Sequence, residues 1–422
     1  QDGLAELRSE IVRYRPAEAV VPPALPAGVK ALLEAEGVVL TPFREEAFHP
    51  DTAARALLTH FGTDTLDGFG CGEYPEAMRA AGATLQYARE TTNSPLGHIT
   101  GLSVRVPSRT MLIDAITLRN LEIFENIRTR GREGTLAATL GLTMTAMGGR
   151  ELRRRLAAPL LSAPAIDARL DAVQFFHDGA GLRRETRALL GGCADVERIA
   201  GRIAYGNAGP RDLAALRDLL LLVPQLRALF AGSEPSLPAS VREALGNLPD
   251  RHEVAALISR ALVDDPPVLA RQGNVIREGY SRDLDDLRDL SRTTKDWVVD
   301  LQRKERERTG IRSLRVGYNQ VFGYYIEVTK ANLHLVPADY RRKQTTAGGE
   351  RFIIEELAEK GARIASADEK ILALEGELYA SLVRSLQAEI PCLQAMARGL
   401  AELDVAAALA EAARANGYTR PV

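Results

Sequence analysis

The sequence predicts a mostly α-helical, multidomain fold with a partial α/β domain near its N-terminal end and a small antiparallel β-sheet between two long helices. The chain has 422 residues, whereas one domain usually takes roughly 150, so we expect about two to four domains. Apolar residues recur at helical spacing along most of the chain. Around residues 314–328 the spacing changes to the alternation that is typical of strands.

Composition and charge exclude several classes of protein. The chain is 45% hydrophobic and its formal net charge is −2, which argues against a uniformly basic nucleic-acid binder but permits a local basic patch. No apolar run approaches the roughly 20 residues that span a bilayer. The first residues lack the basic and apolar parts of a signal peptide. We therefore expect a cytoplasmic protein, and the missing initiator Met suggests a piece of a longer chain.

Cysteines, histidines and catalytic motifs give no sign of a metal site or an active site. Cys71, Cys193 and Cys392 lie far apart, as expected for small core residues in a reducing cytosol. No two histidines have the spacing of metal ligands on a helix. The chain contains neither a GxxxxGK[ST] phosphate loop nor a GxSxG elbow. We predict that this chain is not an enzyme and binds no cofactor.

Residues 1–95 have the pattern of an α/β domain. An apolar helical stripe begins at Leu4, and two short apolar runs at 19–21 and 38–40 predict strands. Further helices are expected at about 51–61 and 75–91, with a glycine-rich loop at 68–70 between them. Two strands are few for an independent sheet, so we expect a truncated domain.

Residues 95–275 are predicted to be almost wholly helical. Apolar spacing indicates helices over about 117–127, 134–160, 167–176 and 210–222. Arg150, Arg153, Arg154 and Arg155 form one basic face, which we interpret as a solvated or ion-paired face, with contact to DNA or a partner domain as the alternative. A last helix over 393–416 is expected to end at Gly417, a typical C-terminal cap.

Two long helices enclose the segment whose pattern differs. Apolar residues at intervals of three, four or seven run from about 280 to 308 and again from 364 to 382, which is typical of a coiled-coil-like pair. Between them, the residues after Leu314 and those from Val321 onward alternate and are rich in β-branched and aromatic side chains. This pattern predicts a β-hairpin or small sheet, with a tip over about 308–355.

The predicted β-tip is the main candidate for a functional site. The segment from Arg303 to Arg351 contains eleven Lys and Arg residues but only five acidic residues. Such a surplus of positive charge favours binding of a polyanion, and that binding would weaken steeply with salt. Polar and glycine residues at 344–349 offer further donors and close backbone approach to phosphates. A solvated, charge-rich hairpin end explains the residues alone equally well. The predicted DNA contacts are Arg312, Arg315, Lys330, Arg341, Arg342, Lys343, Gln344, Thr345, Gly348 and Arg351.

Two other patterns in this segment have structural interpretations. The Glu and Arg residues that alternate over 303–308 are expected to pair on the helix surface at i,i+4. Tyr318, Tyr324 and Tyr325 could stack on bases, but their spacing along strands favours cross-strand packing.

Several segments, in collinear order over the whole chain, resemble the MutS family. The clamp signature of that family is similar to residues 314–330, and its following segment is similar to 344–345 with 350–352. Segments similar to its core are 118–123, 145–150, 153–160, 167–173, 210–213 and 400–421.

The resemblance implies a domain map and a function. Residues 1–98 would form a truncated connector domain, 99–285 the helical core and outgoing lever, 286–374 the clamp with the lever ends, and 375–422 the returning lever and the end of the core. In this family the clamp holds double-stranded DNA by its backbone, two subunits close a ring, and ATP binding moves the levers. The expected partners are duplex DNA, a second subunit and a MutL-type protein.

This chain departs from the family pattern in four places. We find no N-terminal mismatch reader with its Phe-x-Glu wedge, and no C-terminal ATPase, where ATP and Mg²⁺ are expected to bind and where the main dimer interface lies. The first connector strands are also missing. At the clamp tip many relatives place a Lys or Ala and then an Asn ahead of Ala-Glu-Arg, whereas this chain has Ala347-Gly348-Gly349. We therefore expect a side-chain phosphate contact to be lost there or replaced by backbone donors.

Two further hypotheses remain, and the first of them is from another class of protein. The helical pair and its tip resemble a structural coiled-coil arm that docks a protein partner. A MutS paralogue acting outside mismatch repair is the other, although the hairpin at 314–330 argues against it because some such relatives lack the clamp.

Overall fold

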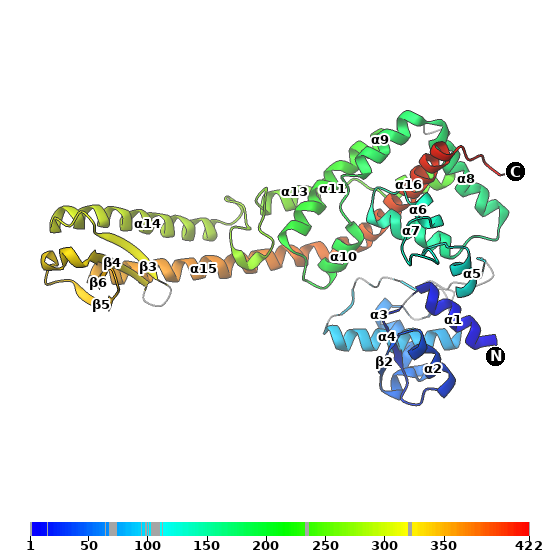
Figure 1. Ribbon diagram of the computed structural model, residues 1–422, viewed down its shortest axis with the longest axis horizontal. Helices are drawn as coiled ribbons and strands as arrows, with labels where there is room; N and C mark the ends of the chain where they lie inside the picture. The colour runs from blue at the N-terminus through cyan, green and yellow to red at the C-terminus, as the bar shows by residue number, and fades with distance from the viewer. Residues whose placement is uncertain are drawn as a thin grey trace. The chain divides into compact units, whose positions relative to one another are not determined.

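The computed structural model describes residues 2–14, 16–63, 65–66, 74–93, 95–97, 99, 101–102, 110–111, 113–232, 236–319 and 323–421. Helices dominate this part of the chain, and the larger of its two sheets has four antiparallel strands, which confirms the predicted fold class. The chain packs as two compact units (Figure 1). Unit 1 comprises residues 1–208, 215–255 and 386–422, and unit 2 comprises 209–214 and 256–385.

The N-terminal part of unit 1 has the predicted α/β pattern. Strands β1 and β2 pair in parallel, with Val20 beside Thr41. Two apolar clusters hold this part together, one around Val21 and Leu33 and the other around Leu57 and Leu85. The predicted loop at 68–70 lies outside the described residues. The elements are α1 (Asp2–Tyr14), β1 (Glu18–Val21), α2 (Ala27–Ala35), β2 (Val39–Pro42), η1 (Glu45–Phe48), α3 (Pro50–Phe61) and α4 (Pro75–Thr92).

The helical core of unit 1 is built around α16 (Ile390–Asn416), which packs against α7, α8, α9, α10 and α12 (Figure 1). Its buried residues occur all around the helix, as expected for a central helix, and Gly417 ends it at φ 68° as predicted. The other helices of this core are α5 (Ala115–Asn120), α6 (Leu136–Leu140), α7 (Ala146–Ala157), α8 (Ala163–Asp178), α9 (Ala180–Leu190), α10 (Val196–Ala204) and α12 (Ala239–Gly246). Helices α11 (Pro210–Ala228) and α13 (His252–Ala261) have residues in both units.

Two predicted helices of this region are shorter than expected. The helix predicted over 117–127 ends at Asn120, and Glu122 then adopts a left-handed φ of 47°. The Asn126 side chain accepts bonds from the backbone N–H groups of Arg128 and Thr129, which makes a turn instead of a helix. The helix predicted over 134–160 is two helices, because Thr145 caps a new one by accepting from Gly148 N at 2.9 Å.

A buried carboxylate joins α16 to the start of α7. Asp404 is fully buried and accepts hydrogen bonds from Met144 N at 2.8 Å, Thr145 N at 2.8 Å and the Thr145 hydroxyl at 2.7 Å. A Cβ at Gly148 would lie 2.2 Å from the Oδ2 atom of Asp404, so glycine is required there.

Burial, with a smaller contribution from Asp404, raises the pKa of the Cys193 thiol to about 12, which keeps this thiol protonated and unreactive at neutral pH.

Unit 2 contains the two long predicted helices, α14 (Arg282–Thr309) and α15 (Glu355–Leu386), which run side by side (Figure 1). Their facing sides are joined by an ion pair between Arg288 and the buried Glu375 and by a 2.7 Å hydrogen bond from Ser291 to Asp368. The four remaining strands connect one helix to the other. Among the described residues, no helix contains an apolar stretch of the length that would span a membrane.

We expect Asp404→Ala to lower the free energy of unfolding by about 3 kcal/mol, because it leaves buried backbone and hydroxyl donors without an acceptor. Urea denaturation followed by circular dichroism would measure this. Asp218, an exposed carboxylate that pairs with Arg217, is the matched control, and Asp218→Ala should change stability by less than about 0.5 kcal/mol. Equal effects of the two substitutions would contradict the role given to Asp404.

Candidate nucleic-acid interface

The predicted β-tip is a four-stranded antiparallel sheet with the strand order β3-β4-β6-β5. Its strands are β3 (Arg315–Asn319), β4 (Gly323–Thr329), β5 (Arg341–Thr345) and β6 (Gly349–Ile353), with η6 (Lys330–Leu335) between the two hairpins. Strands β3 and β4 confirm the predicted hairpin, although residues 320–322 lie outside the described part. The sequence gives no alternation over 341–345 that would have identified β5, because this strand is a polar edge.

One face of the sheet packs onto the ends of the two long helices. Val316, Ile326 and Phe352 are neighbours across three strands and so share a face. They join an apolar core with Leu301 from α14 and Leu357 from α15. The only tryptophan of the chain, Trp297, packs against the same core, with the Lys360 ammonium 4.1 Å from its ring centre.

A polar row crosses the opposite face. Arg315, Glu327, Arg351 and Gln344 are successive cross-strand neighbours. Arg351 donates to Gln344 at 2.9 Å, lies 3.5 Å from a Glu327 oxygen and stacks 4.3 Å from the centre of the Tyr325 ring. Two of the residues predicted to contact DNA, Gln344 and Arg351, therefore have contacts within the sheet.

Most of the other predicted contacts are exposed cations. Arg312, Arg315, Lys330, Arg341 and Lys343 are exposed, and none has a side-chain hydrogen bond or ion pair with any residue that the structure describes. Lys343 is the extra residue of a β-bulge.

The remaining three predicted contacts differ from one another. Arg342 lies 3.4 Å from a Glu350 carboxylate oxygen, so it is already paired. Thr345 and Gly348 are exposed. Whether any of the ten predicted residues touches DNA stays a prediction.

The two glycines of the β5–β6 turn have different roles, which corrects the expectation that both bring backbone N–H groups to a phosphate. Gly349 is buried and its N–H donates to the Thr346 hydroxyl at 3.2 Å. A Cβ there would lie 2.2 Å from the Val328 carbonyl oxygen, so glycine allows β4 and β6 to approach. Only Gly348 is exposed, with open space around it.

The tyrosines and the Glu-Arg run behave as structural features. Tyr318 and Tyr324 are direct cross-strand neighbours with ring centres 5.0 Å apart, which confirms cross-strand packing for these two tyrosines. The expected i,i+4 spacing of ion pairs over 303–308 is wrong: Arg303 pairs with Asp300, and Arg308 with Glu305, at i,i+3.

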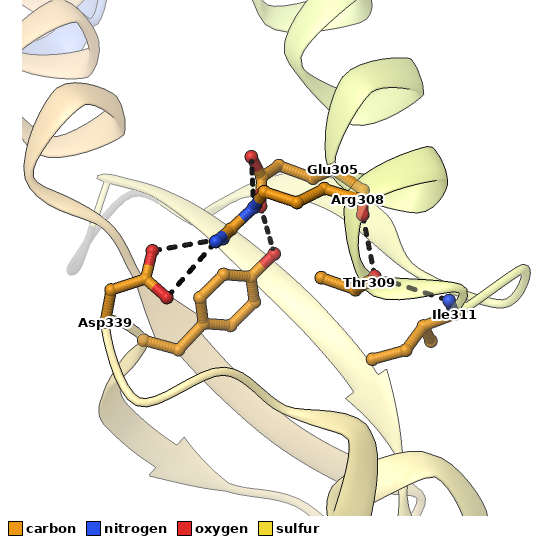
Figure 2. Close-up of polar contacts among 6 residues, drawn as sticks. Glu305, Arg308, Thr309, Ile311 and Asp339 are labelled. Atoms are coloured by element: carbon orange, nitrogen blue, oxygen red, sulfur yellow. Dashed lines mark hydrogen bonds and ion pairs between the residues drawn. The ribbon is translucent and has the colours of Figure 1, made fainter.

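A partly buried network at the end of α14 was not predicted (Figure 2). The Glu305 carboxylate accepts hydrogen bonds from Arg308 at 2.7 Å and from the Tyr340 hydroxyl at 2.8 Å, and Arg308 reaches Asp339 at 3.0 Å. Burial, and then the bond to Glu305, raise the pKa of Tyr340 well above its ordinary value. Sequence reasoning missed this cluster because its partners are up to 35 residues apart and none belongs to a recognisable motif.

The other basic cluster, in unit 1, is ion-paired. Arg150 lies 2.7 Å from Asp195 and 2.6 Å from Glu197, and Arg154 and Arg155 both bind Glu151. The Arg153 guanidinium stacks 4.1 Å from the centre of the Phe124 ring. These contacts favour the ion-paired interpretation of this face. Elsewhere in the described ranges, no three His, Cys, Asp or Glu side chains are grouped to hold a metal ion.

Comparison with known proteins matches the chain to two family models. MutS domain II matches residues 1–100 and MutS domain III matches residues 116–410. The chain is 45% identical to the DNA mismatch repair protein MutS of Methanosarcina acetivorans, 42% identical to that of Symbiobacterium thermophilum and 39% identical to that of Myxococcus xanthus. The alignments cover 100%, 100% and 99% of this chain, and 47%, 48% and 47% of those relatives. The chain thus spans about half their length.

We expect Gly349→Ala to lower the stability of the sheet by at least about 2 kcal/mol, because the new methyl group would overlap the Val328 carbonyl and separate β4 from β6. Gly348→Ala is the matched control and should cost less than about 0.5 kcal/mol. Trp297 fluorescence in a urea titration reports on the core beneath the sheet. A Gly349→Ala midpoint equal to that of Gly348→Ala would refute the close approach.

Proposed function

Because the chain belongs to the MutS family, we propose that it acts in DNA mismatch repair and that its four-stranded sheet holds duplex DNA through the phosphate backbone. The observation that supports this most is the set of exposed cations without partners among the described residues, Arg312, Arg315, Lys330, Arg341 and Lys343. They lie within one small sheet and its flanking turns, in a chain of net charge −2. Lys and Arg side chains on phosphates release counterions and bind without reading sequence.

The long helices suit a role in transmitting conformational signals. Arg288 and Glu375 join α14 to α15 at one level, and Ser291 and Asp368 join them at the next. The sheet shares its apolar core with the far ends of both helices. A pair tied in this way moves as one body, so a displacement at its base would be passed to the sheet.

We extend the proposal to a full-length MutS-family protein, because the relatives that match this chain are about twice its length. We propose that it binds mismatched duplex DNA, that two copies act together, and that a MutL-type protein is a further partner. ATP and Mg²⁺ would bind outside the residues of this chain, which would itself hold DNA without catalysing a reaction.

We expect Arg341→Glu combined with Lys343→Glu to weaken duplex binding by about tenfold or more at 0.1 M salt, because two phosphate contacts become repulsions. Fluorescence anisotropy of a labelled duplex across a salt series would also show a shallower log-affinity slope, by about 0.9 for each lost contact. Arg303→Glu is the control, since Arg303 already pairs with Asp300 on α14.

Unchanged affinity in the double variant would contradict DNA holding by this sheet. If an acidic protein displaced the labelled duplex as effectively as unlabelled duplex DNA does, the alternative of a docking arm would be favoured.

A further inference from the structure

Strand β5 bears cations at three consecutive positions but has few backbone constraints of its own. It lies at the edge of the sheet and, among the strands that the structure describes, pairs with β6 alone. Its register shifts at the bulge between Arg342 and Gln344. Arg341 and Lys343, with no partner among the described residues, repel each other and the neighbouring Arg342. An edge strand of this kind needs an anchor if its charges are to be held at defined positions.

The residues just before β5 supply such an anchor. Tyr340 is 7% exposed, its ring centre lies 5.8 Å from that of Phe352, and its hydroxyl donates to Glu305 at 2.8 Å. Asp339 accepts from Arg308, which also donates to Glu305 (Figure 2). Two successive residues are therefore tied to the last turns of α14 immediately before the basic strand begins.

The inner and outer contacts of this network differ in strength. The Arg308–Asp339 pair is about half exposed, at 46% and 55%, and such pairs contribute little. The Glu305 side chain is 10% exposed, so its carboxylate needs hydrogen-bond donors to offset the loss of hydration. A hydrogen bond from a hydroxyl to a charged acceptor is directional and strong. Because the raised pKa keeps Tyr340 protonated, its hydroxyl remains a donor at all ordinary pH values.

We propose that Glu305 and Tyr340 are positioning residues that fix the basic strand β5 relative to the end of α14, so that Arg341 and Lys343 meet phosphates together. This inference rests on the proposed DNA-holding function. It goes beyond it by assigning a role to two residues that do not themselves contact DNA.

The test is a double-mutant cycle on the full chain, with duplex affinity measured across a salt series. Tyr340→Phe retains the ring and removes only the hydroxyl. We expect it to weaken binding about threefold to tenfold and to make the salt slope shallower, as we also expect of Arg341→Ala combined with Lys343→Ala. Adding Tyr340→Phe to the variant that already lacks both cations should weaken binding little further. Tyr318→Phe is the matched control, because Tyr318 lies in the same sheet and its hydroxyl has no hydrogen bond with the described residues.

A second pair of variants tests the acceptor. Glu305→Gln retains an oxygen for the Tyr340 hydroxyl and should bind within about twofold of the unmodified chain, whereas Glu305→Ala should resemble Tyr340→Phe. Native Trp297 emission identifies variants whose sheet is folded. If Tyr340→Phe were unfolded, the comparison of Glu305→Gln with Glu305→Ala would decide whether the Glu305–Tyr340 contact positions β5.

The possible failures are distinguishable. Additive losses in the cycle, or an affinity of Tyr340→Phe equal to that of Tyr318→Phe, would overturn the positioning role. If Arg341→Ala with Lys343→Ala left duplex binding unchanged, the proposed function of β5 would fail first, whatever Tyr340→Phe did.

Discussion

The apolar core shared by the sheet and the two long helices is the constraint on which the proposed interface depends. A small sheet of short strands depends for its stability on packing of its apolar face. Ile326 and Phe352 therefore pack against Leu301 and Leu357 at the helix ends. Because that core occupies one face of the sheet, the opposite face and the edge remain available for charge.

Periodicity in the sequence was sufficient to predict most of the fold. The helical stripes of α14 and α15, the β3–β4 hairpin and the cap at Gly417 follow from local spacing and glycine conformation, and the structure confirms them. Local spacing failed to predict the backbone conformation where a polar group distant in the sequence determines it. The predicted helix over 134–160 divides because Thr145 becomes a cap, and its hydroxyl is oriented by Asp404 from 259 residues away.

The candidate site was less predictable than the fold, because composition locates a basic segment but not the partner of each cation. Counting charges could not distinguish Arg341, which has no partner in the described part of the chain, from Arg351, which is held by Gln344 and Tyr325. Nor could it show that Gly349 serves strand packing. These distinctions arise from register, and a one-residue shift in pairing would reverse them.

The position of β5 at the edge of its sheet has a second consequence, for solubility. An edge strand exposes backbone N–H and C=O groups that can pair with a strand of another molecule and start aggregation. Three adjacent positive charges and a bulge at Lys343 oppose such pairing, since a second copy of this edge would bring like charges together. The side chains proposed to hold a polyanion would thus also keep copies of the protein apart whenever no polyanion is bound.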